Sequence, residues 1–397
     1  MNNKVSVVKC DRYSEVQNAV ENAVSLIGGI GKFVKKGDNV VIKPNLVSKK
    51  KPEEAVTTNP EFLHAVIVMV EKAGGNVTIA ESPGGPYNTA ALKGVYSVCG
   101  VDKAIEGTNA KLNFDTSFTE VHFPEGKTVK KIPIINPILN ADVIISLPKL
   151  KTHAMTSYTG AVKNLFGTIP GTYKAELHFR LNERKSFCSM LVDLHECVKP
   201  TLSIMDAVWG MEGNGPTQGS ARPIGCLIAA QSAHKLDLAA CGLIGLTPGE
   251  VPTLTAAIRR GLCPDSAEKL TIFGDPAAFT VPDYKTVPSQ ASVFFRSGGK
   301  GPVARLADSF LFHMLTPYPR LCARDCIGCK KCEKVCKFEA IIVENAYPVI
   351  DYDKCKSCGL CAKECPRGCI ENLRKPKVVA PKPEPAKEKP AEKAEAE

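Results

Sequence analysis

Eight cysteines near the end of the chain repeat one spacing. They form the runs Cys326, Cys329, Cys332, Cys336 and Cys355, Cys358, Cys361, Cys365, and each run reads C-x2-C-x2-C-x3-C. Every cysteine of the first run recurs 29 residues later in the second. Thiolates at this spacing are ligands of 4Fe-4S clusters, which transfer single electrons. The two runs therefore predict two 4Fe-4S clusters.

The fourth cysteine of each run is predicted to serve the cluster of the other run, as in bacterial-type ferredoxins. The first cluster would then be held by Cys326, Cys329, Cys332 and Cys365. The second would be held by Cys355, Cys358, Cys361 and Cys336. Because each cluster joins both halves of the segment, neither half is expected to fold well without iron.

Zinc sites and disulfides are the alternatives. Zinc modules use two C-x2-C pairs with a longer gap, whereas a triple run repeated in register offers more thiolates than a four-coordinate ion takes. The sequence departs from the ferredoxin pattern at one position, since Pro366 follows the second run but Lys337 follows the first. This departure bears on the potential of the first site and not on its existence.

The residues between the two runs are predicted to form a short hairpin. Residues 340–343 and 348–352 are apolar and rich in β-formers, and residues 344–347 form the turn. The apolar side chains that could cover the clusters from water are Ile327, Val335, Phe338, Ile341, Ile350, Leu360 and Ile370.

The composition is that of a globular protein with reduced thiols. Of 397 residues, 44% are hydrophobic, and the 17 cysteines are an odd number with nine scattered outside the runs, which favours a reducing cytoplasm over a disulfide framework. The pattern predicts no signal segment and no membrane-spanning run. The lysines are dispersed and aromatic residues are only 6%, so no nucleic-acid module is predicted. We assign the net charge of +10 to solvated surface and to a pocket for an anionic ligand.

Strands and helices alternate through the first 300 residues. Strands are predicted at 5–8, 39–44, 77–80, 141–147, 202–207, 224–230 and 270–273, and helices at 14–27, 60–73, 186–198 and 236–244. This alternation is typical of an α/β domain with a three-layer, mostly parallel sheet. The predicted order is an α/β domain at 1–300, a linker helix at 301–319, a small α+β ferredoxin-like domain at 320–372, and a disordered Lys/Pro/Glu/Ala tail at 373–397.

Polar residues follow three of the predicted strands. They are Lys43 and Asn45 after the second strand, Lys149, Lys151 and His153 after the fourth, and Asp206 and Glu212 after the fifth, with Lys163 and Asn164 further downstream. The carboxyl ends of parallel strands meet at one edge, where open α/β sheets bind ligands. Taken alone, each of these residues is more often a solvated strand end or a turn than a functional group. Together the lysines predict a pocket for a carboxylate or phosphate.

Roles within this pocket follow from the side-chain chemistry. His153 could transfer protons near neutral pH, and Asp206 or Glu212 could orient it or act as the base. Lys149 and Lys151 are assigned to catalysis with them, and Lys43, Asn45, Lys163 and Asn164 to binding of the anion. His64 and His195 are interpreted as structural. Metal-binding side chains also occur at His195, Glu196, Cys197 and Cys188, but buried thiols on an amphipathic helix are the favoured interpretation there.

Several runs of the chain resemble a known family. The runs VVIKPNLV, TTNPEFLHAV, AESPGG, LPKLKTH, TGAVKNLFG and MEGNGPTQG, followed by the double cysteine motif, resemble the domain of unknown function 362 family of iron-sulfur proteins. The resemblance spans most of residues 38–372. It implies a prokaryotic, often anaerobic, iron-sulfur protein with the α/β part in front, and it supplies no catalytic assignment.

Three functions are compatible with these features. The first is an electron-transfer protein or reductase component whose two clusters serve a reaction at the α/β domain or in a redox partner protein. Residues 320–372 hold ten Lys and Arg against eight Asp and Glu, so a strongly acidic docking surface is absent and a partner within the chain is favoured. The second is a non-redox enzyme for an anionic small molecule, with structural or sensing clusters. The third is a non-catalytic iron-sulfur scaffold. A flavin is neither predicted nor excluded.

Overall fold

The computed structural model describes residues 3–171, 173–181, 183–287, 317–321, 326–336, 338–344, 347–352, 354–355 and 359–374. Cys358, residues 301–316 of the predicted linker helix and residues 375–397 of the predicted tail lie outside these ranges.

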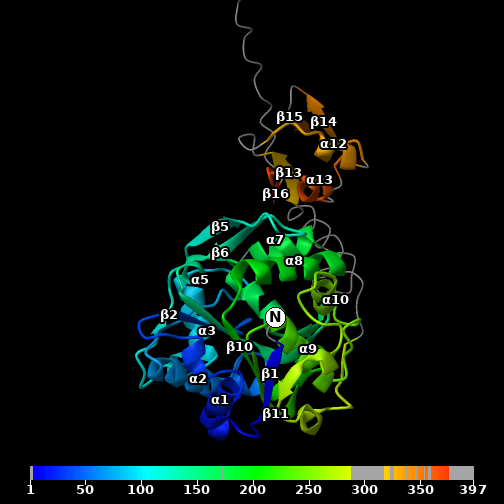
Figure 1. Cartoon of the computed structure of the whole chain (residues 1–397). Helices are drawn as coiled ribbons and strands as arrows, with labels where there is room; N and C mark the ends of the chain where they lie inside the picture. Colours follow the sequence, from blue (N-terminus) through cyan, green and yellow to red (C-terminus); the bar gives the residue numbers. More distant parts are fainter. Residues whose placement is uncertain are drawn as a thin grey trace, which may run out of the picture.

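One ten-stranded sheet forms the centre of the α/β domain (Figure 1). Its main path runs in the order β12 (Thr271–Phe273), β1 (Lys4–Lys9), β11 (Ser220–Ala230), β10 (Leu202–Glu212), β7 (Val143–Leu147), β2 (Asn39–Pro44), β3 (Asn76–Ile79) and β4 (Lys111–Leu112). Two further strands leave this path, since β8 (Lys149–His153) pairs with β10 and β9 (Ser157–Thr159) pairs with β8.

Most neighbouring strands are parallel. β2 runs parallel to β3 and β7, and β10 runs parallel to β7 and β8. The exceptions on the main path lie around β11, which is antiparallel to both β1 and β10. β1 therefore runs in the direction of β2 but is separated from it by β11, β10 and β7.

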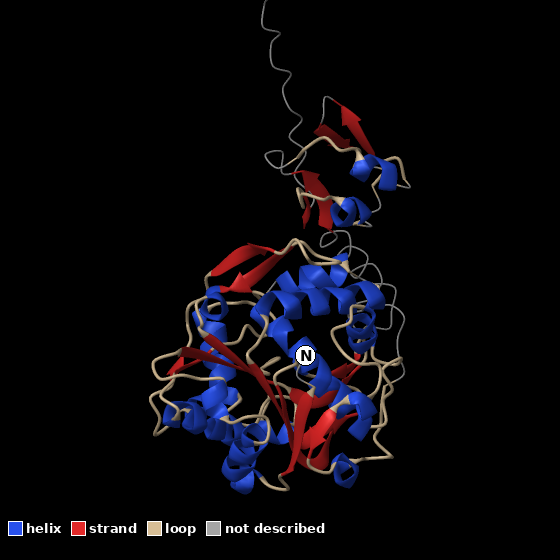
Figure 2. Ribbon diagram, in the orientation of Figure 1, coloured by secondary structure: helices blue, strands red, loops and turns tan. Residues whose placement is uncertain are grey.

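Helices cover both faces of the sheet, as Figure 2 shows. Alternate residues of one strand reach opposite cores, because side chains in a strand point to the two faces in turn. Val40 and Ile42 of β2 pack in one core, and Val41 packs in the other. The predicted α/β fold with a three-layer, mostly parallel sheet is therefore confirmed.

Helices from different parts of the chain form the two layers. The first contains α1 (Val16–Ser25), α2 (Pro60–Lys72), α3 (Thr89–Val98) and α4 (Val101–Ala104). The second contains α5 (Asn136–Leu139), α6 (Ala161–Asn164), α7 (Tyr173–Arg180), α8 (Arg184–Val198), α9 (Ala233–Leu243) and α10 (Pro252–Arg259). Short 3-10 turns are η1 (Tyr13–Glu15), η2 (Ile30–Lys32), η3 (Pro52–Glu54), η4 (Leu165–Thr168), η5 (Ala267–Lys269) and η6 (Pro276–Phe279).

The start of α2 shows how local residues fix a helix boundary. The Asn59 side chain accepts a hydrogen bond from the Glu61 N–H at 2.8 Å, and Pro60 occupies the first helical position, where no N–H is needed. Several features differ from the prediction. Lys149, Lys151 and His153 belong to a further strand, β8, and the helices α3, α7 and α10 are not predicted. β5 (Phe118–His122) and β6 (Lys131–Ile135) form a separate hairpin, and β10 and β11 are each longer than expected.

The C-terminal unit contains a short helix after each cysteine loop. These helices, α12 (Lys331–Val335) and α13 (Leu360–Glu364), are offset by the same 29 residues as the cysteines. The predicted hairpin is present as β14 (Ile341–Glu344) and β15 (Tyr347–Ile350). A second pair joins β13 (Pro317–Leu321) to β16 (Ile370–Arg374), so both ends of the unit meet in one ribbon.

Within the ranges that the structure describes, no helix combines the length and the apolar character needed to cross a bilayer.

Candidate functional site

The ends of β2 and β3 bring opposite charges together inside the α/β domain. Lys43 lies near the end of β2, and Glu81 follows β3, which is the parallel neighbour of β2. The Lys43 ammonium donates a hydrogen bond to Glu81 and pairs with its charge, and both side chains are almost completely buried. Lys43 also donates to the Pro44 carbonyl at 2.8 Å and to Asn164 Oδ1 at 3.2 Å.

Asn164 connects α6 to this edge of the sheet. Its Oδ1 also accepts a hydrogen bond from Asn45 Nδ2 at 3.0 Å, and its own Nδ2 donates to Ser146 Oγ at 3.0 Å. The α6 backbone is fixed in turn by Asp237 of α9, which accepts from the Ala161 and Val162 N–H groups at 2.6 and 3.0 Å. The sheet edge and α6 therefore form one buried polar network.

Lys149 and Asp206 form a second buried ion pair. They lie opposite each other on β8 and β10, and Lys149 Nζ is 2.8 Å from Asp206 Oδ2. Tyr13 lies between them, accepting from Lys149 at 2.9 Å and donating to Asp206 Oδ1 at 3.0 Å. Tyr13 also lines a surface groove with Trp209, so this buried pair is one side chain away from solvent.

Lys151 is buried without a carboxylate partner among the described residues. Its Nζ donates to Asn45 Oδ1 and to the Val56 carbonyl, each at 2.7 Å. Burial lowers its pKa well below the usual value, and the positive charges of Lys163 and Lys149 add to this effect. Lys163 is half-buried over the Phe166 ring, and burial lowers the pKa of Lys163 to about 8. This part of the cluster therefore has an excess of amine groups over carboxylates.

His153 lies on β8 beyond Lys151. Its Nδ1 accepts from the Met155 N–H at 3.0 Å, which places the ring proton on Nε2. Burial lowers the pKa of His153 well below its usual value, and the nearby Lys163, His178 and Lys151 lower it further. The imidazole is therefore neutral at pH 7, and its Nδ1 is occupied by the turn that follows β8.

The two predicted carboxylates do not orient His153. Asp206 is occupied by Lys149 and Tyr13, and it also accepts from the Asn59 N–H at 3.1 Å. Glu212 lies six residues after Asp206 on the same strand. β10 continues to Glu212 past a bulge at residues 207–209. There it accepts from the Lys285 N–H at 3.1 Å and lies 4.0 Å from Arg222.

The sequence-based prediction omits several charged or hydroxyl groups of this network, of which three bear on its charge. They are Glu81, Tyr13 and Lys174. Glu81 carries the same signal as Lys43, since it follows a buried strand at the same edge of the sheet. Lys174 of α7 donates to the carbonyls of Ser82 and Ile169, each at 2.6 Å, and burial lowers the pKa of Lys174 to about 7. Tyr13 belongs to η1, and no local pattern indicates where its side chain reaches.

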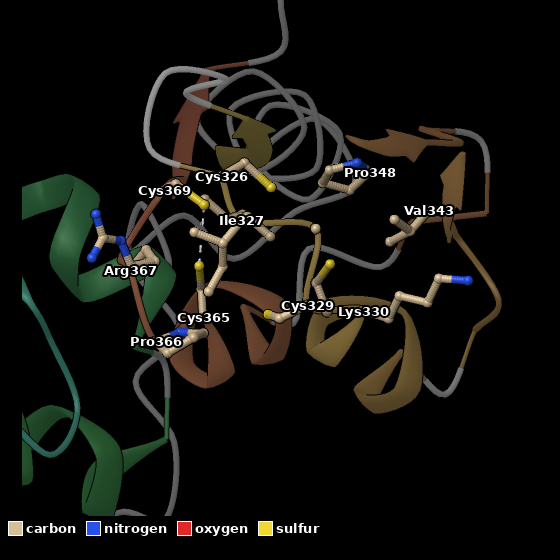
Figure 3. A pocket seen from close by; sticks show the side chains of 13 residues that line it. Cys326, Ile327, Cys329, Lys330, Val343, Pro348, Cys365, Pro366, Arg367 and Cys369 are labelled. Carbon is tan, nitrogen blue, oxygen red and sulfur yellow. Dashed lines mark hydrogen bonds between the residues drawn. The ribbon is translucent and has the colours of Figure 1, made fainter. Parts of the chain in front are cut away.

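In the C-terminal unit, sulfurs from both cysteine runs line one cavity. Three belong to the first run, namely Cys326, Cys329 and Cys332, and one is Cys365, the last cysteine of the second run (Figure 3). The structure thus brings together the four thiols that the spacing predicts for the first cluster. A set of four thiols is the donor set that a 4Fe-4S cluster requires.

The second predicted set is only partly described, because Cys358 lies outside the described residues. Cys355 and Cys361 flank that position, and Cys361 is buried in α13. Cys336 Sγ accepts a hydrogen bond from the Ala340 N–H at 3.3 Å. No disulfide joins the described cysteines.

Cys369 adds a further sulfur to the first cavity. Its Sγ lies 3.2 Å from Cys365 Sγ, and the two side chains point toward each other in Figure 3. The internal repeat places Ala340 at the corresponding position of the first half, 29 residues earlier. Cys369 is therefore an addition to the repeated pattern, and its thiol is close enough to contact a cluster ligand.

Comparison with protein families assigns both parts of the chain. Residues 40–242 match the family described as "Domain of unknown function (DUF362)", and residues 348–371 match the family described as "4Fe-4S binding domain". The second match includes the second cysteine run, so the C-terminal unit is of the 4Fe-4S binding type.

One curated relative matches a long part of the chain, and others match a short segment. "Thylakoid-associated protein sll1697" from Synechocystis is 34% identical over 266 residues, which cover 65% of this chain and 79% of that protein. One component of the ion-translocating oxidoreductase complex from Methanosarcina acetivorans is 49% identical over 51 residues, which cover 13% of this chain and 19% of that protein. "Pyruvate synthase subunit PorD" from Thermotoga maritima is 44% identical over 54 residues, which cover 13% of this chain and 54% of that protein.

Solved structures add little to this assignment. The lactate racemase apoprotein from Thermoanaerobacterium thermosaccharolyticum aligns with 59% of this chain and 56% of its own, at 12% identity and a TM-score of 0.37. A likeness of this size supports no functional comparison. The matched family covers half of the chain and the long relative extends beyond it, so the chain belongs to the DUF362 family and carries a C-terminal 4Fe-4S binding domain.

Proposed function

We propose that this protein is an electron-transfer protein or reductase component in which two 4Fe-4S clusters relay electrons to or from a reaction at the α/β domain or in a partner. The observation that carries this proposal is the cavity lined by sulfurs of both cysteine runs. Two relatives that match a short segment of this chain are named as parts of an oxidoreductase complex and of pyruvate synthase, which agrees with a redox role for the unit.

In this proposal the ligand sets follow the exchange between the two halves. Cys326, Cys329, Cys332 and Cys365 hold the first cluster, and Cys355, Cys358, Cys361 and Cys336 hold the second. When bound, the clusters supply one-electron chemistry. The chain contributes the thiolates, the Ala340 N–H that donates to Cys336, and the buried side chains of Ile341, Val343 and Ile370, which exclude water.

Anaerobic purification with iron and sulfide analysis tests this proposal. We expect about eight irons and about eight sulfides per chain, together with an EPR signal from each cluster on stepwise reduction. About four irons per chain would reduce the unit to one cluster. Zinc in place of iron would end the electron-transfer assignment.

Lys43, Lys149, Lys151 and Lys163 are here called the lysine cluster. We propose that this cluster is the reaction site for an anionic small molecule. Lys43 and Lys149 each have a buried carboxylate partner, whereas Lys151 and Lys163 have none among the described residues. An anion bound beside these two amines would supply the missing negative charge. α7 connects this cluster to the ferredoxin unit, because it carries Lys174 and also packs against β13.

Binding of the anion is expected to weaken as the pH rises through about 8, the pKa of Lys163. Lys163 is protonated below this pH and loses its charge above it. If that charge is required, the apparent affinity for inorganic phosphate or acetate should fall about tenfold between pH 7 and pH 9. Isothermal titration of the full chain measures this change.

Matched variants identify the amine that is responsible. Lys163→Met should weaken binding at pH 7 and reduce the pH dependence between pH 7 and pH 9. Lys269→Met removes an exposed lysine paired with Asp265 and should leave both unchanged. Equal affinity of wild type and Lys163→Met across this pH range would exclude Lys163 from the site.

A further inference from the structure

A second group of metal-binding side chains lies between α8 and α9, outside the networks described above. His195 and Glu196 are near the end of α8, and His234 is the second residue of α9. His195 Nδ1 is 2.9 Å and His234 Nε2 is 3.0 Å from Glu196 Oε1. One ligand atom from each of the three residues lies within 4.8 Å of the others.

This group is separated from the lysine cluster along α8. Cys188 of the same helix lies near enough to Lys163 to influence its pKa. His195 follows Cys188 by seven residues, which is about 10 Å of helix. Arg260, whose positive charge acts on His234, is paired with Asp193 at 2.7 Å. The group is therefore a separate candidate site from the lysines.

The hydrogen bonds within the group do not satisfy both imidazoles. His195 Nε2 and His234 Nδ1 are buried and have no hydrogen-bond partner among the described residues. These are the ring nitrogens that do not contact Glu196, so the atoms that could hold an ion together with Glu196 are His195 Nδ1 and His234 Nε2. Glu196 keeps about a quarter of its side chain exposed, so an ion and a water molecule can reach the group from solvent.

We propose that His195, Glu196 and His234 bind a single zinc ion. Two imidazole nitrogens and one carboxylate oxygen are a common ligand set for zinc, whereas magnesium and calcium prefer oxygen ligands alone. Three protein ligands leave a fourth position for water on the side where Glu196 is exposed. The ion would join the end of α8 to the start of α9.

Equilibrium dialysis of the full chain with its clusters in place, against zinc chloride, tests the proposal. We expect one zinc per chain in wild type by elemental analysis. Glu196→Gln and His234→Gln should each weaken zinc binding at least about tenfold. Glu196→Gln has the same size and remains a hydrogen-bond acceptor, so it separates loss of the ligand from loss of the fold. His64→Gln is the matched control, because His64 lies on α2, away from this group, and its Nδ1 is 2.9 Å from the Ala104 carbonyl.

Zinc could instead bind to one of the many thiols, and X-ray absorption at the zinc edge distinguishes the two cases. Nitrogen and oxygen ligands at about 2.0–2.1 Å support the proposal, whereas sulfur ligands at about 2.3 Å contradict it. Absence of zinc from wild type after dialysis, or equal zinc content in wild type and Glu196→Gln, would also overturn it.

Discussion

Replacing Cys365 with alanine is expected to remove the cluster of the first cysteine loop and about half of the iron in the protein. Cys365 belongs to the second run by sequence, but its sulfur lines the cavity formed by Cys326, Cys329 and Cys332. A cluster that loses one of four thiolates is held by the first loop alone. Iron analysis and EPR of the anaerobically purified variant measure the loss.

The residual EPR spectrum decides which loop lost its cluster. If the fourth ligands are exchanged, Cys365→Ala and Cys329→Ala leave the same remaining signal, and Cys336→Ala leaves the other one. If each run instead held its own cluster, Cys365→Ala would not resemble Cys329→Ala. The comparison therefore tests the exchange itself and not only the presence of iron.

Cys369 requires a second variant in this experiment. Its sulfur is 3.2 Å from that of Cys365 and could replace it as a ligand. The double variant Cys365→Ala/Cys369→Ala removes this substitute, and alanine at 369 restores the residue that the first half has at position 340. Retention of all iron in the double variant would show that Cys365 is not a ligand. Cys197→Ser, a half-buried thiol on α8, controls for loss of a cysteine elsewhere.

Local sequence signals locate the site residues that were expected at the ends of strands. Lys43, Asn45, Lys149 and Lys151 are predicted to converge because parallel strands end at the same edge. In the structure, hydrogen bonds connect Lys43 to Asn164, Asn164 to Asn45, and Asn45 to Lys151. The same rule applied to β3 would have found Glu81.

The remaining features depend on pairing between distant segments. The sequence pattern ends β10 at residue 207, but pairing with β11 extends the strand to Glu212, whose carboxylate accepts from the Lys285 N–H. β1 lies beside β11 and β12, and no periodicity in residues 4–9 selects these neighbours. Tyr13 reaches Asp206 only because β1 and η1 are placed there. Strand order is set by packing over the whole sheet, which single segments do not encode.

Replacing Glu81 with glutamine is expected to lower the stability of the α/β domain by about 3–5 kcal/mol. Glu81 is the buried partner of Lys43, and both side chains are almost inaccessible to solvent. Burial raises the pKa of Glu81 and lowers the pKa of Lys43, while each partner opposes the shift of the other. Glutamine has the size of glutamate but no charge, so Lys43 would be left buried with an uncompensated ammonium or would have to lose its proton.

Urea unfolding of the full chain measures this effect. Trp209 is the single tryptophan of the protein and lies on β10, so its fluorescence reports unfolding of the α/β domain. Glu106→Gln, at an exposed position, should change the free energy of unfolding by no more than about 0.5 kcal/mol.

The double variant Lys43→Met/Glu81→Gln separates the charge from the shape of the site. Removing both charges should restore most of the lost stability, because replacing a whole buried pair by neutral groups of similar volume is often close to neutral. A loss below about 1 kcal/mol in Glu81→Gln would instead mean that Lys43 is already held as a neutral amine. The same loss in the single and double variants would mean that the shape of Glu81, and not its charge, holds this edge of the sheet together.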